Sequence, residues 1–333
     1  MVNPGTCLTK YNMSIVSAFL FLTLGLVILV IASDWLVQGA VKLSFLSRLS
    51  PLFIAMVLVA FGTSAPEAGV GIIAALKNQK SIALGNIIGS NIANIGLILG
   101  ICALTRPLRI NKQVFKREVP IMLVSAFLFY ALSIDLLISR VDGLILIICF
   151  VGFCFISYRG AKDSFDVREI EGFKLKKIVD KTNSRIKVAI IMLFSLSGLV
   201  FGADLMVKGG VALANIFKIS PWIIGITVFA VGTSLPELAA SLSATLRKVP
   251  SISAGNIIGS NIFNVLFVLG VVALIRPINV KPDVLTFALP VMVLFSIFLF
   301  IIGRTKYQVT RREGLAMLLG YVLFIVLILK GGV

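Results

Sequence analysis

The stretch GNIIGSNIAN at residues 85–94 recurs as GNIIGSNIFN at residues 255–264, with nine of its ten positions identical. A second stretch, GTSAPE at residues 62–67, recurs as GTSLPE at residues 232–237. Both recurrences are offset by 170 residues, which shows that the chain is an internal duplication. The fold is therefore expected to consist of two similar halves.

Composition places these two halves in a membrane. Of the 333 residues, 59% are hydrophobic and only 14% are charged, whereas soluble domains have about 45–50% apolar residues. This excludes a disordered chain, a disulfide scaffold and a soluble enzyme, and the absence of histidine excludes His-based triads, His-ligated metals and haem sites. The net charge of +17 does not indicate a nucleic-acid partner, because the basic residues lie between apolar runs, as in the cytoplasmic loops of membrane proteins.

Ten apolar runs are long enough to cross a bilayer, which takes about 20 helical residues. Each copy holds five, and because five is odd, the second copy must enter the membrane upside down. The sequence thus predicts an all-α polytopic membrane protein with ten transmembrane helices in two inverted five-helix repeats, residues 1–158 and 187–333, joined by a linker at 159–186. Inverted repeats are the architecture of secondary transporters, whose site lies at the repeat interface. The expected spans are 14–38, 52–76, 81–104, 118–135, 142–158, 187–212, 222–246, 251–274, 283–302 and 312–330.

The basic residues set the orientation of these spans. Nine of the 31 Lys and Arg residues fall on the side of the N-terminus, and the other 22 fall on the opposite side. The positive-inside rule makes the richer side cytoplasmic. We therefore expect an integral membrane protein of the plasma (inner) membrane, with both termini outside and the 159–186 loop in the cytoplasm. The nine are Lys10, Lys77, Lys80, Arg140, Lys208, Lys218, Arg276, Lys281 and Lys330.

Two glutamates, Glu67 and Glu237, lie inside expected spans and form a repeat pair. An ionisable side chain within a span costs ~2.5–3.5 kcal/mol on insertion scales and indicates a functional site. Each glutamate follows a proline, which removes a backbone hydrogen bond and frees the carbonyl four residues earlier. Each GTSxPE stretch therefore offers free carbonyls, two hydroxyls and a carboxylate at one depth. The alternative is a simple proline kink whose glutamate lines a wet crevice.

Two such stretches facing each other would supply two carboxylates and several neutral oxygens. That set suits Ca²⁺, which takes 6–8 oxygen ligands in flexible geometry, better than Mg²⁺, which sheds water reluctantly. Soft transition metals are disfavoured because these stretches contain neither histidine nor cysteine.

A second repeat pair of acidic residues, Asp34 and Asp204, lies toward the ends of its spans. Capping, gating and ion binding all stay open for these two carboxylates. Their proximity in sequence suggests Lys42 and Lys208 as ion-pair partners.

The longer repeated stretch carries a polar stripe. Asn86, Ser90 and Asn94 are spaced four residues apart, so they share one face of a helix. Their equivalents are Asn256, Ser260 and Asn264. We expect the serines and the last asparagine of each stripe to line the site. We expect the other amides to hold helices together; these are Asn86, Asn91, Asn256 and Asn261.

The paired stretches resemble the α-repeats of the sodium/calcium exchanger (cation/calcium antiporter) superfamily, in its prokaryotic form, and the resemblance covers essentially the whole chain. It implies that helices 2, 3, 7 and 8 surround the ions, and that helices 1 and 6 slide to alternate access. It also implies Glu67 and Glu237 as the main carboxylate ligands, and no cofactor beyond the transported Ca²⁺ and Na⁺. The remaining implied ligands are Ala60, Thr63, Ser64, Ser90, Asn94, Ala230, Thr233, Ser234, Ser260 and Asn264.

One position departs from the family pattern. Many relatives carry Asp where this chain has Asn264. Without a third carboxylate the potassium-dependent branch of the family is disfavoured. The choice between Na⁺ and H⁺ as the counter-ion stays open.

The sequence therefore favours a Na⁺/Ca²⁺ antiporter working by alternating access, in which the two glutamates hold either Ca²⁺ or Na⁺. An H⁺/Ca²⁺ exchanger is the alternative within this class, because a proton can compete with a cation for two neighbouring carboxylates. A cation channel is the alternative outside it, but a channel usually builds its pore from symmetric subunits. No nucleophile–base pair indicates an enzyme. The oligomeric state stays open, and the lipid bilayer is the expected environment.

Overall fold

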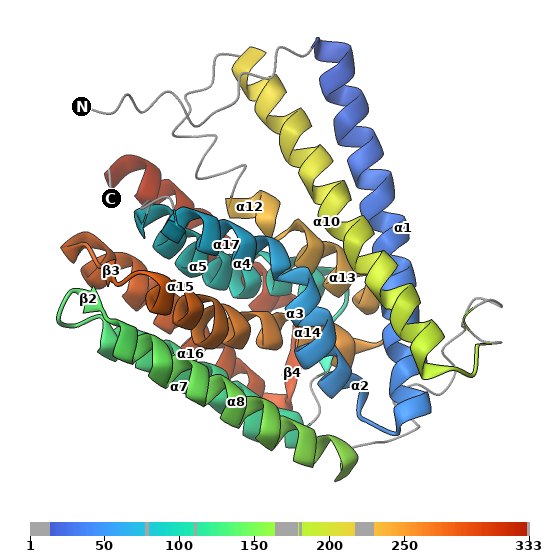
Figure 1. The fold of residues 1–333 in the computed structure, drawn as a ribbon. Coiled ribbons are helices and arrows are strands. Elements are labelled where there is room, and N and C mark those ends of the chain that lie inside the picture. The colour runs from blue at the N-terminus through green and yellow to red at the C-terminus, as the bar shows by residue number, and fades with distance from the viewer. Residues whose placement is uncertain are drawn as a thin grey trace.

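The computed structural model describes residues 14–76, 80–109, 112–163, 179, 182–216 and 230–331, and these residues are almost entirely helical (Figure 1). Most of the 159–186 linker lies outside the described residues. The helical elements of the first copy, with η marking a π-helix, are α1 (Ile15–Ser47), α2 (Pro51–Phe53), η2 (Ile54–Val59), α3 (Ala60–Thr63), α4 (Ala65–Leu76), α5 (Lys80–Ala93), η3 (Asn94–Leu99), α6 (Gly100–Thr105), α7 (Lys112–Leu132) and α8 (Arg140–Asp163). Those of the second copy are α10 (Arg185–Ile216), α12 (Ala230–Thr233), α13 (Leu235–Leu246), α14 (Pro250–Ile262), η6 (Phe263–Val268), α15 (Leu269–Ile275), η7 (Val284–Ala288), α16 (Leu289–Lys306) and α17 (Arg311–Gly331).

Six stretches of the described chain are long and apolar enough to cross a membrane, and the bent pair of α2–α3 with α4 makes a seventh. These seven coincide with seven of the ten predicted spans, so the chain is an integral membrane protein. The other three predicted spans overlap α7, α12–α13 and α17. Both α7 and α17 begin with charged residues, and residues 222–229 lie outside the described part of the chain.

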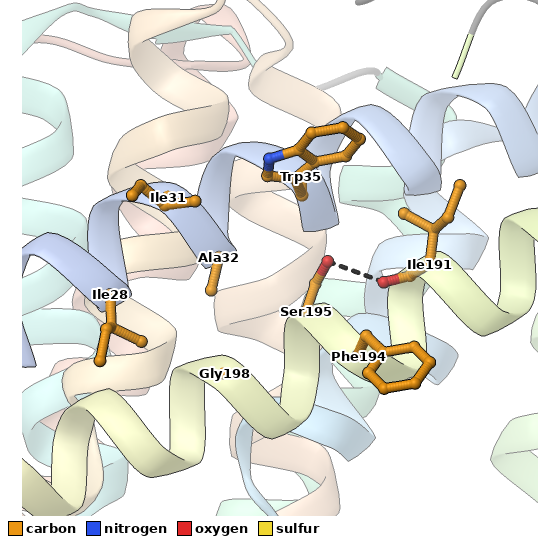
Figure 2. Close-up of a pocket in the computed structure, with 8 residues that line it drawn as sticks. All are labelled: Ile28, Ile31, Ala32, Trp35, Ile191, Phe194, Ser195 and Gly198. Atoms are coloured by element: carbon orange, nitrogen blue, oxygen red, sulfur yellow. Dashed lines mark hydrogen bonds between the residues drawn. The ribbon is translucent and has the colours of Figure 1, made fainter. Parts of the chain in front are cut away.

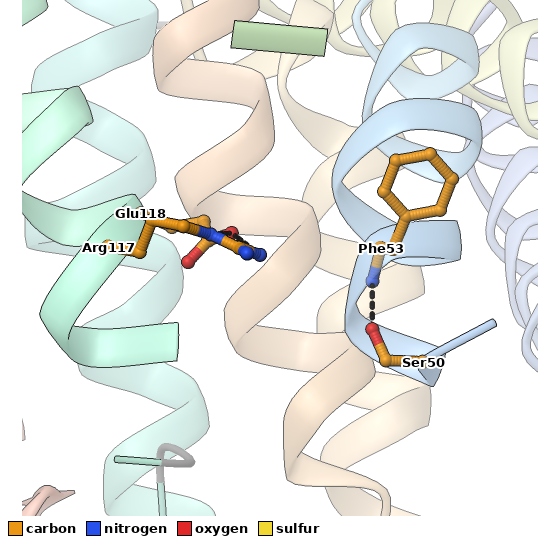
Figure 3. A network of polar contacts seen from close by, with 4 residues as sticks. All are labelled: Ser50, Phe53, Arg117 and Glu118. Carbon is orange, nitrogen blue, oxygen red and sulfur yellow. Dashed lines mark hydrogen bonds and ion pairs between the residues drawn. The ribbon is translucent and has the colours of Figure 1, made fainter. Parts of the chain in front are cut away.

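Helix α1 is longer than the predicted span 14–38 and continues to Ser47. The apolar run ends near Gln38, but Gln38 and Lys42 are both buried by neighbouring helices, so the helix continues through them. It ends where Arg48 adopts a left-handed conformation with φ 52°. Ser50 then caps α2 by accepting a hydrogen bond from the backbone N–H of Phe53 at 3.2 Å (Figure 3).

Helices α1 and α10 lie side by side along one flank of the molecule (Figure 1). Glycines permit their close approach: a Cβ at Gly25 would lie 2.6 Å from the carbonyl oxygen of Gly202, and a Cβ at Gly209 would lie 2.8 Å from that of Ala18. The buried residues of α1 concentrate between Ala32 and Ser44, where α1 also packs on α13.

Two short antiparallel ribbons join the two copies. β1 (Leu108–Arg109) pairs with β4 (Gln308–Val309), and β2 (Leu137–Ile138) pairs with β3 (Ile278–Asn279). Shifting one ribbon by the 170-residue offset reproduces the other to within one residue. The all-α prediction missed these strands, because two-residue strands in loops leave no hydrophobic alternation to detect.

Candidate cation site

The GTSxPE stretches form helix breaks in both copies. In the first copy α3 ends at Thr63, Ser64 follows with φ −84° and ψ 9°, and the axis bends by 45° between residues 51–63 and 65–76. In the second copy Ser234 (φ −89°, ψ 6°) separates α12 from α13 in the same way. Pro66 and Pro236 follow as second residues of the new helices, where a missing N–H leaves no helical hydrogen bond unmade. The kink expected from the prolines is present.

The two breaks face each other and exchange hydrogen bonds. Ser64 donates from Oγ to Oε1 of Glu237 at 2.6 Å, and Ser234 donates to Oε1 of Glu67 at 3.1 Å. Ser260 also donates to Oε1 of Glu237, at 3.4 Å. Both carboxylates are completely buried and interact electrostatically with each other. The structure therefore brings the two predicted glutamates together, each held by a serine of the other copy.

Several polar atoms around the glutamates have no protein partner. Ten buried side-chain nitrogen and oxygen atoms in the described part of the chain lack a hydrogen bond, and seven of them belong to predicted site residues. A buried polar atom without a partner is costly and requires an explanation, such as a bound ion. The seven are Oε2 of Glu67, Oε2 of Glu237, Oγ of Ser90, and both amide atoms of Asn94 and of Asn264.

The two central asparagines lie on π-helical turns. Asn94 begins η3, and Asn264 is the second residue of η6. A π-turn widens the helix and frequently occurs at functional sites, and here it presents both amides to the buried space. No residue pattern in the sequence indicated these turns.

Two amides that the sequence assigned to helix contacts connect their helices to the glutamate segments. Asn86 donates to the carbonyl of Glu67 at 3.2 Å, and Asn256 donates to that of Glu237 at 3.3 Å. The polar stripe was the signal for both. Asn91 and Asn261 instead donate to carbonyls of their own helices, those of Ile87 and Ile257, so these bonds do not connect two helices.

The two threonines of the GTSxPE stretches bond to amides of the opposite copy. Thr63 donates to Oδ1 of Asn256 at 3.1 Å, and Thr233 donates to Oδ1 of Asn86 at 3.3 Å. The carbonyl of Ala60 accepts from the backbone N–H of Ser64 at 2.9 Å. Its equivalent, Ala230, is the first residue of α12.

The aspartates lie outside this cluster. Asp34 forms an ion pair with Arg247, at the end of α13, and accepts a hydrogen bond from Gln38 at 2.9 Å. Asp204 pairs with Lys208 of its own helix at 2.6 Å, as sequence proximity suggested. The Asp34–Arg247 ion pair thus connects the two copies, whereas the Asp204–Lys208 ion pair lies within one helix.

A further buried carboxylate, Glu118, was placed at a span end by the sequence. Helix α7 begins six residues earlier, at Lys112, and Glu118 is completely buried within it. It forms an ion pair with its neighbour Arg117 (Figure 3). Glu118 has no acidic equivalent in the second copy, where Ala288 stands at the same offset.

A cavity of ≈ 420 Å³ lies away from the glutamates, between α1 and α10 (Figure 2). Its lining is apolar except for Ser195, whose hydroxyl donates to the carbonyl of Ile191 at 2.8 Å. No predicted site residue lines this cavity. It is therefore not a site for a cation.

Within the described residues no cluster of three or more His, Cys, Asp or Glu side chains occurs. The candidate site instead combines two carboxylates with neutral hydroxyl and amide oxygens, all of them hard ligands. Such a set, enclosed by broken helices in an integral membrane protein, defines an ion transporter.

Comparison with known proteins identifies the family. The profile described as "Sodium/calcium exchanger protein" matches residues 17–159 and 187–330. The chain is 33% identical to the sodium/calcium exchanger MaX1 of Methanosarcina acetivorans over 342 aligned positions, which cover 93% of this chain and 98% of that protein. It is 34% identical to the inner membrane protein YrbG of Escherichia coli over 310 positions, covering 92% and 95%. Solved structures of the sodium-calcium exchanger NCX_Mj match with a TM-score of 0.81 at 29% identity, covering 94% of this chain and 99% of that chain. The chain belongs to the sodium/calcium exchanger family.

Proposed function

We propose that the chain is a secondary antiporter that exchanges Ca²⁺ for Na⁺ across the membrane by alternating access. The observation that carries this proposal is the reciprocal pair of buried glutamates, each with Oε1 bonded to a serine of the other copy and Oε2 without a partner. Two carboxylates of charge −1 match one divalent cation. They equally match two monovalent cations, so the same oxygens serve either ion but not both together.

The proposed ligand set follows from the residues that converge there. Glu67 and Glu237 supply the two charges, and their Oε2 atoms face the cation. Ser90, Asn94 and Asn264 supply oxygen atoms that also lack protein partners. Hydroxyls that donate their proton to a carboxylate or an amide keep lone pairs for a cation. The neutral ligands completing the set are Ala60, Thr63, Ser64, Ala230, Thr233, Ser234 and Ser260.

The choice of Na⁺ as counter-ion rests on Asn264 and on the relatives. An amide takes up no proton near neutral pH, so Asn264 adds an oxygen without adding a proton-binding group. The name of MaX1 and the description of the NCX_Mj structures, which concern ion exchange with Na⁺ and Ca²⁺, assign Na⁺ to those proteins. An H⁺/Ca²⁺ exchanger is the competing assignment, because the two glutamates themselves bind protons.

The proposed architecture is ten transmembrane helices in two inverted five-helix repeats, residues 1–158 and 187–333, with the 159–186 linker in the cytoplasm. The reciprocal hydrogen bonds and the two equivalent ribbons support the inversion, since each contact recurs at the 170-residue offset. The distribution of basic residues supports termini outside the plasma membrane. Helices α1 and α10 are the proposed moving pair, because they lie together on one flank (Figure 1).

Flux measurements on proteoliposomes test the proposal. We expect ⁴⁵Ca²⁺ uptake that is driven by an outward Na⁺ gradient and abolished when a Na⁺ ionophore collapses that gradient. Uptake that follows a pH gradient and ignores Na⁺ would assign the H⁺/Ca²⁺ exchanger instead. Uptake without either gradient, accompanied by unitary currents, would assign a channel.

A further inference from the structure

The side chain of Asn256 bonds to three groups at once. Its Nδ2 donates to the carbonyl of Glu237 at 3.3 Å and to Oγ of Ser241 at 2.9 Å, and its Oδ1 accepts from Thr63 at 3.1 Å. A carbonyl only accepts, so the bond to Glu237 fixes which end of the amide is the NH₂ group. Thr63 donates its single hydroxyl proton on the side where Oδ1 of Asn256 lies at 3.1 Å and the carbonyl of Ala60 at 3.3 Å.

Asn86 repeats two of these three contacts. Its Nδ2 donates to the carbonyl of Glu67 at 3.2 Å, and its Oδ1 accepts from Thr233 at 3.3 Å. The position equivalent to Ser241 is Gly71, which has no side chain to offer. Asn256 is completely buried, whereas Asn86 is half-buried.

The difference between the copies extends along the helix pair. In the second copy Ser241 on α13 bonds Asn256 on α14, and one turn further Thr245 bonds Ser253 across the same interface at 2.9 Å. The equivalent first-copy positions on α4 and α5 are Gly71, Ala75 and Ala83. Two side-chain hydrogen bonds thus connect α13 to α14. Small residues without polar side chains occupy the equivalent positions between α4 and α5.

We propose that Asn86 and Asn256 are positioning residues for the cation ligands, and that the Asn256 bridge is the more rigid of the two. Each bridge connects the backbone of its own glutamate to the threonine hydroxyl of the opposite copy. The amide oxygen accepts the proton of the threonine hydroxyl and holds the side chain in place, which leaves the lone pairs of the hydroxyl oxygen for a cation. This inference rests on the proposed exchange of Na⁺ for Ca²⁺.

The asparagine bridges should affect the affinity for Na⁺ more than the affinity for Ca²⁺. One Ca²⁺ neutralises both carboxylates from a position between them, using their Oε2 atoms. Two Na⁺ ions cannot share that position, because like charges about 4 Å apart repel strongly in a buried site. At least one Na⁺ must therefore use neutral oxygens as well as a carboxylate, and the hydroxyls of the bridged threonines are among those proposed above. Misplacing a threonine hydroxyl consequently weakens Na⁺ binding while leaving the central Ca²⁺ position intact.

Equilibrium ⁴⁵Ca²⁺ binding to the purified full-length protein, with Na⁺ as competitor, measures both affinities. For Asn256→Ala we expect the Na⁺ concentration that displaces half of the Ca²⁺ to rise about fivefold, the loss of one hydrogen bond of ordinary net strength. The Ca²⁺ dissociation constant should change by less than about twofold. Asn86→Ala should act in the same direction by a smaller factor, because its bridge has one contact fewer.

Three milder variants keep the test independent of folding defects. Ser241→Ala removes only the third contact of Asn256 and should raise the Na⁺ requirement about twofold. Gly71→Ser supplies the missing hydroxyl to Asn86 and should lower the Na⁺ requirement, whereas Gly71→Ala should not. A Cβ at Gly71 would meet methyl groups of Val268 and Val272 at 3.3 Å each, and both substitutions make this same Cβ contact.

The outcomes distinguish a failure of the proposed asparagine bridges from a failure of the proposed Na⁺/Ca²⁺ exchange. Wild-type protein whose Ca²⁺ is not displaced by Na⁺ would overturn the proposed function and the bridges with it. If Na⁺ displaces Ca²⁺ from the wild type, but the asparagine variants change both affinities equally or change neither, the proposed role of the bridges would be overturned and the proposed exchange would stand. Identical Na⁺ requirements in Gly71→Ser and Gly71→Ala would overturn the proposed difference in rigidity.

Discussion

The hydroxyl of Ser64 donates a 2.6 Å hydrogen bond to Glu237, a residue of the opposite sequence copy. Its counterpart, from Ser234 to Glu67, is 3.1 Å long, so each carboxylate is oriented by the other half of the chain. Neither copy therefore holds its own glutamate by this contact. The site exists only where the two helix breaks meet.

Neutralising either glutamate should weaken Ca²⁺ binding. At an effective dielectric of about 20, a charge pair near 4 Å interacts by ~4 kcal/mol, part of which is offset by desolvation. Glu67→Gln and Glu237→Gln should each lower Ca²⁺ affinity at least tenfold, since ~1.4 kcal/mol is one decade. Glu118→Gln is the matched control, because it neutralises a buried carboxylate outside the site. Equal Ca²⁺ affinity in wild type and in a folded Glu67→Gln or Glu237→Gln variant would contradict the two-carboxylate site.

Lowering the pH should weaken Ca²⁺ binding as the two glutamine substitutions do. Ca²⁺ binds the ionised carboxylates, so protons and Ca²⁺ compete, and Ca²⁺ affinity should fall as pH falls. Carboxylates at buried positions can take up protons well above the ordinary range near about pH 4, so Ca²⁺ binding would be measured from about pH 8 down to about pH 5. In the Glu67→Gln variant one competing group is gone, so the dependence should be shallower. An unchanged slope in that variant would show that another group is responsible.

A carboxylate at position 264 should alter selectivity more than folding. Asn264 is buried with both amide atoms unpartnered, so Asn264→Asp adds a third buried carboxylate to the proposed ligand set. We expect changed apparent affinities for Na⁺, K⁺ and Ca²⁺, with thermal stability near that of wild type when the ions are present. Asn261→Asp, on the same helical segment but bonded to its own backbone, is the control. Affinities that stay unchanged in Asn264→Asp would remove this residue from the site.

The ion pair of Asp34 with Arg247 should favour the conformation described here, because it ties α1 to the end of α13. Partly exposed ion pairs contribute about 1 kcal/mol or less, so Asp34→Asn should leave overall stability almost unchanged. The same energy shifts a conformational equilibrium up to about fivefold, which spin-label distances between α1 and α13 would detect. Asp204→Asn is the control, because Lys208 lies on the same helix. Unaltered distance distributions in Asp34→Asn would show that the pair does not select a conformation.

The proposed topology is tested by labelling. In a background without native cysteines, a cysteine introduced as Ser164→Cys should resist impermeant thiol reagents in intact cells and react after lysis. A cysteine in the loop before Arg140, such as Asp135→Cys, should react in intact cells. The opposite pattern would reverse the orientation that the basic residues indicate.

Much of the site could be predicted because the duplication itself is visible. Burying polar side chains in an apolar chain is costly unless they contact other polar groups. The two polar stretches were therefore expected to meet, which places Glu67 and Glu237 together. The partner of Asp34 could not be predicted, since Arg247 lies 213 residues away and only the packing of α1 on α13 brings it near. The π-turns at Asn94 and Asn264 likewise leave no mark in the residue pattern. Asn86 and Asn256 connect helices as expected, but the polar stripe did not reveal that their partners are the glutamate segments and the threonines of the opposite copy.

The two β-ribbons connect the two copies through loops at the ends of some helices only. β1–β4 and β2–β3 fasten loops beside α6, α7, α8, α15, α16 and α17, and neither includes residues of α1 or α10. The ribbons therefore hold these helices of the two copies to each other, while α1 and α10 pack against them without a strand contact. If α1 and α10 are the moving pair, as proposed, their displacement leaves both ribbons intact, and a change of access does not require the copies to separate.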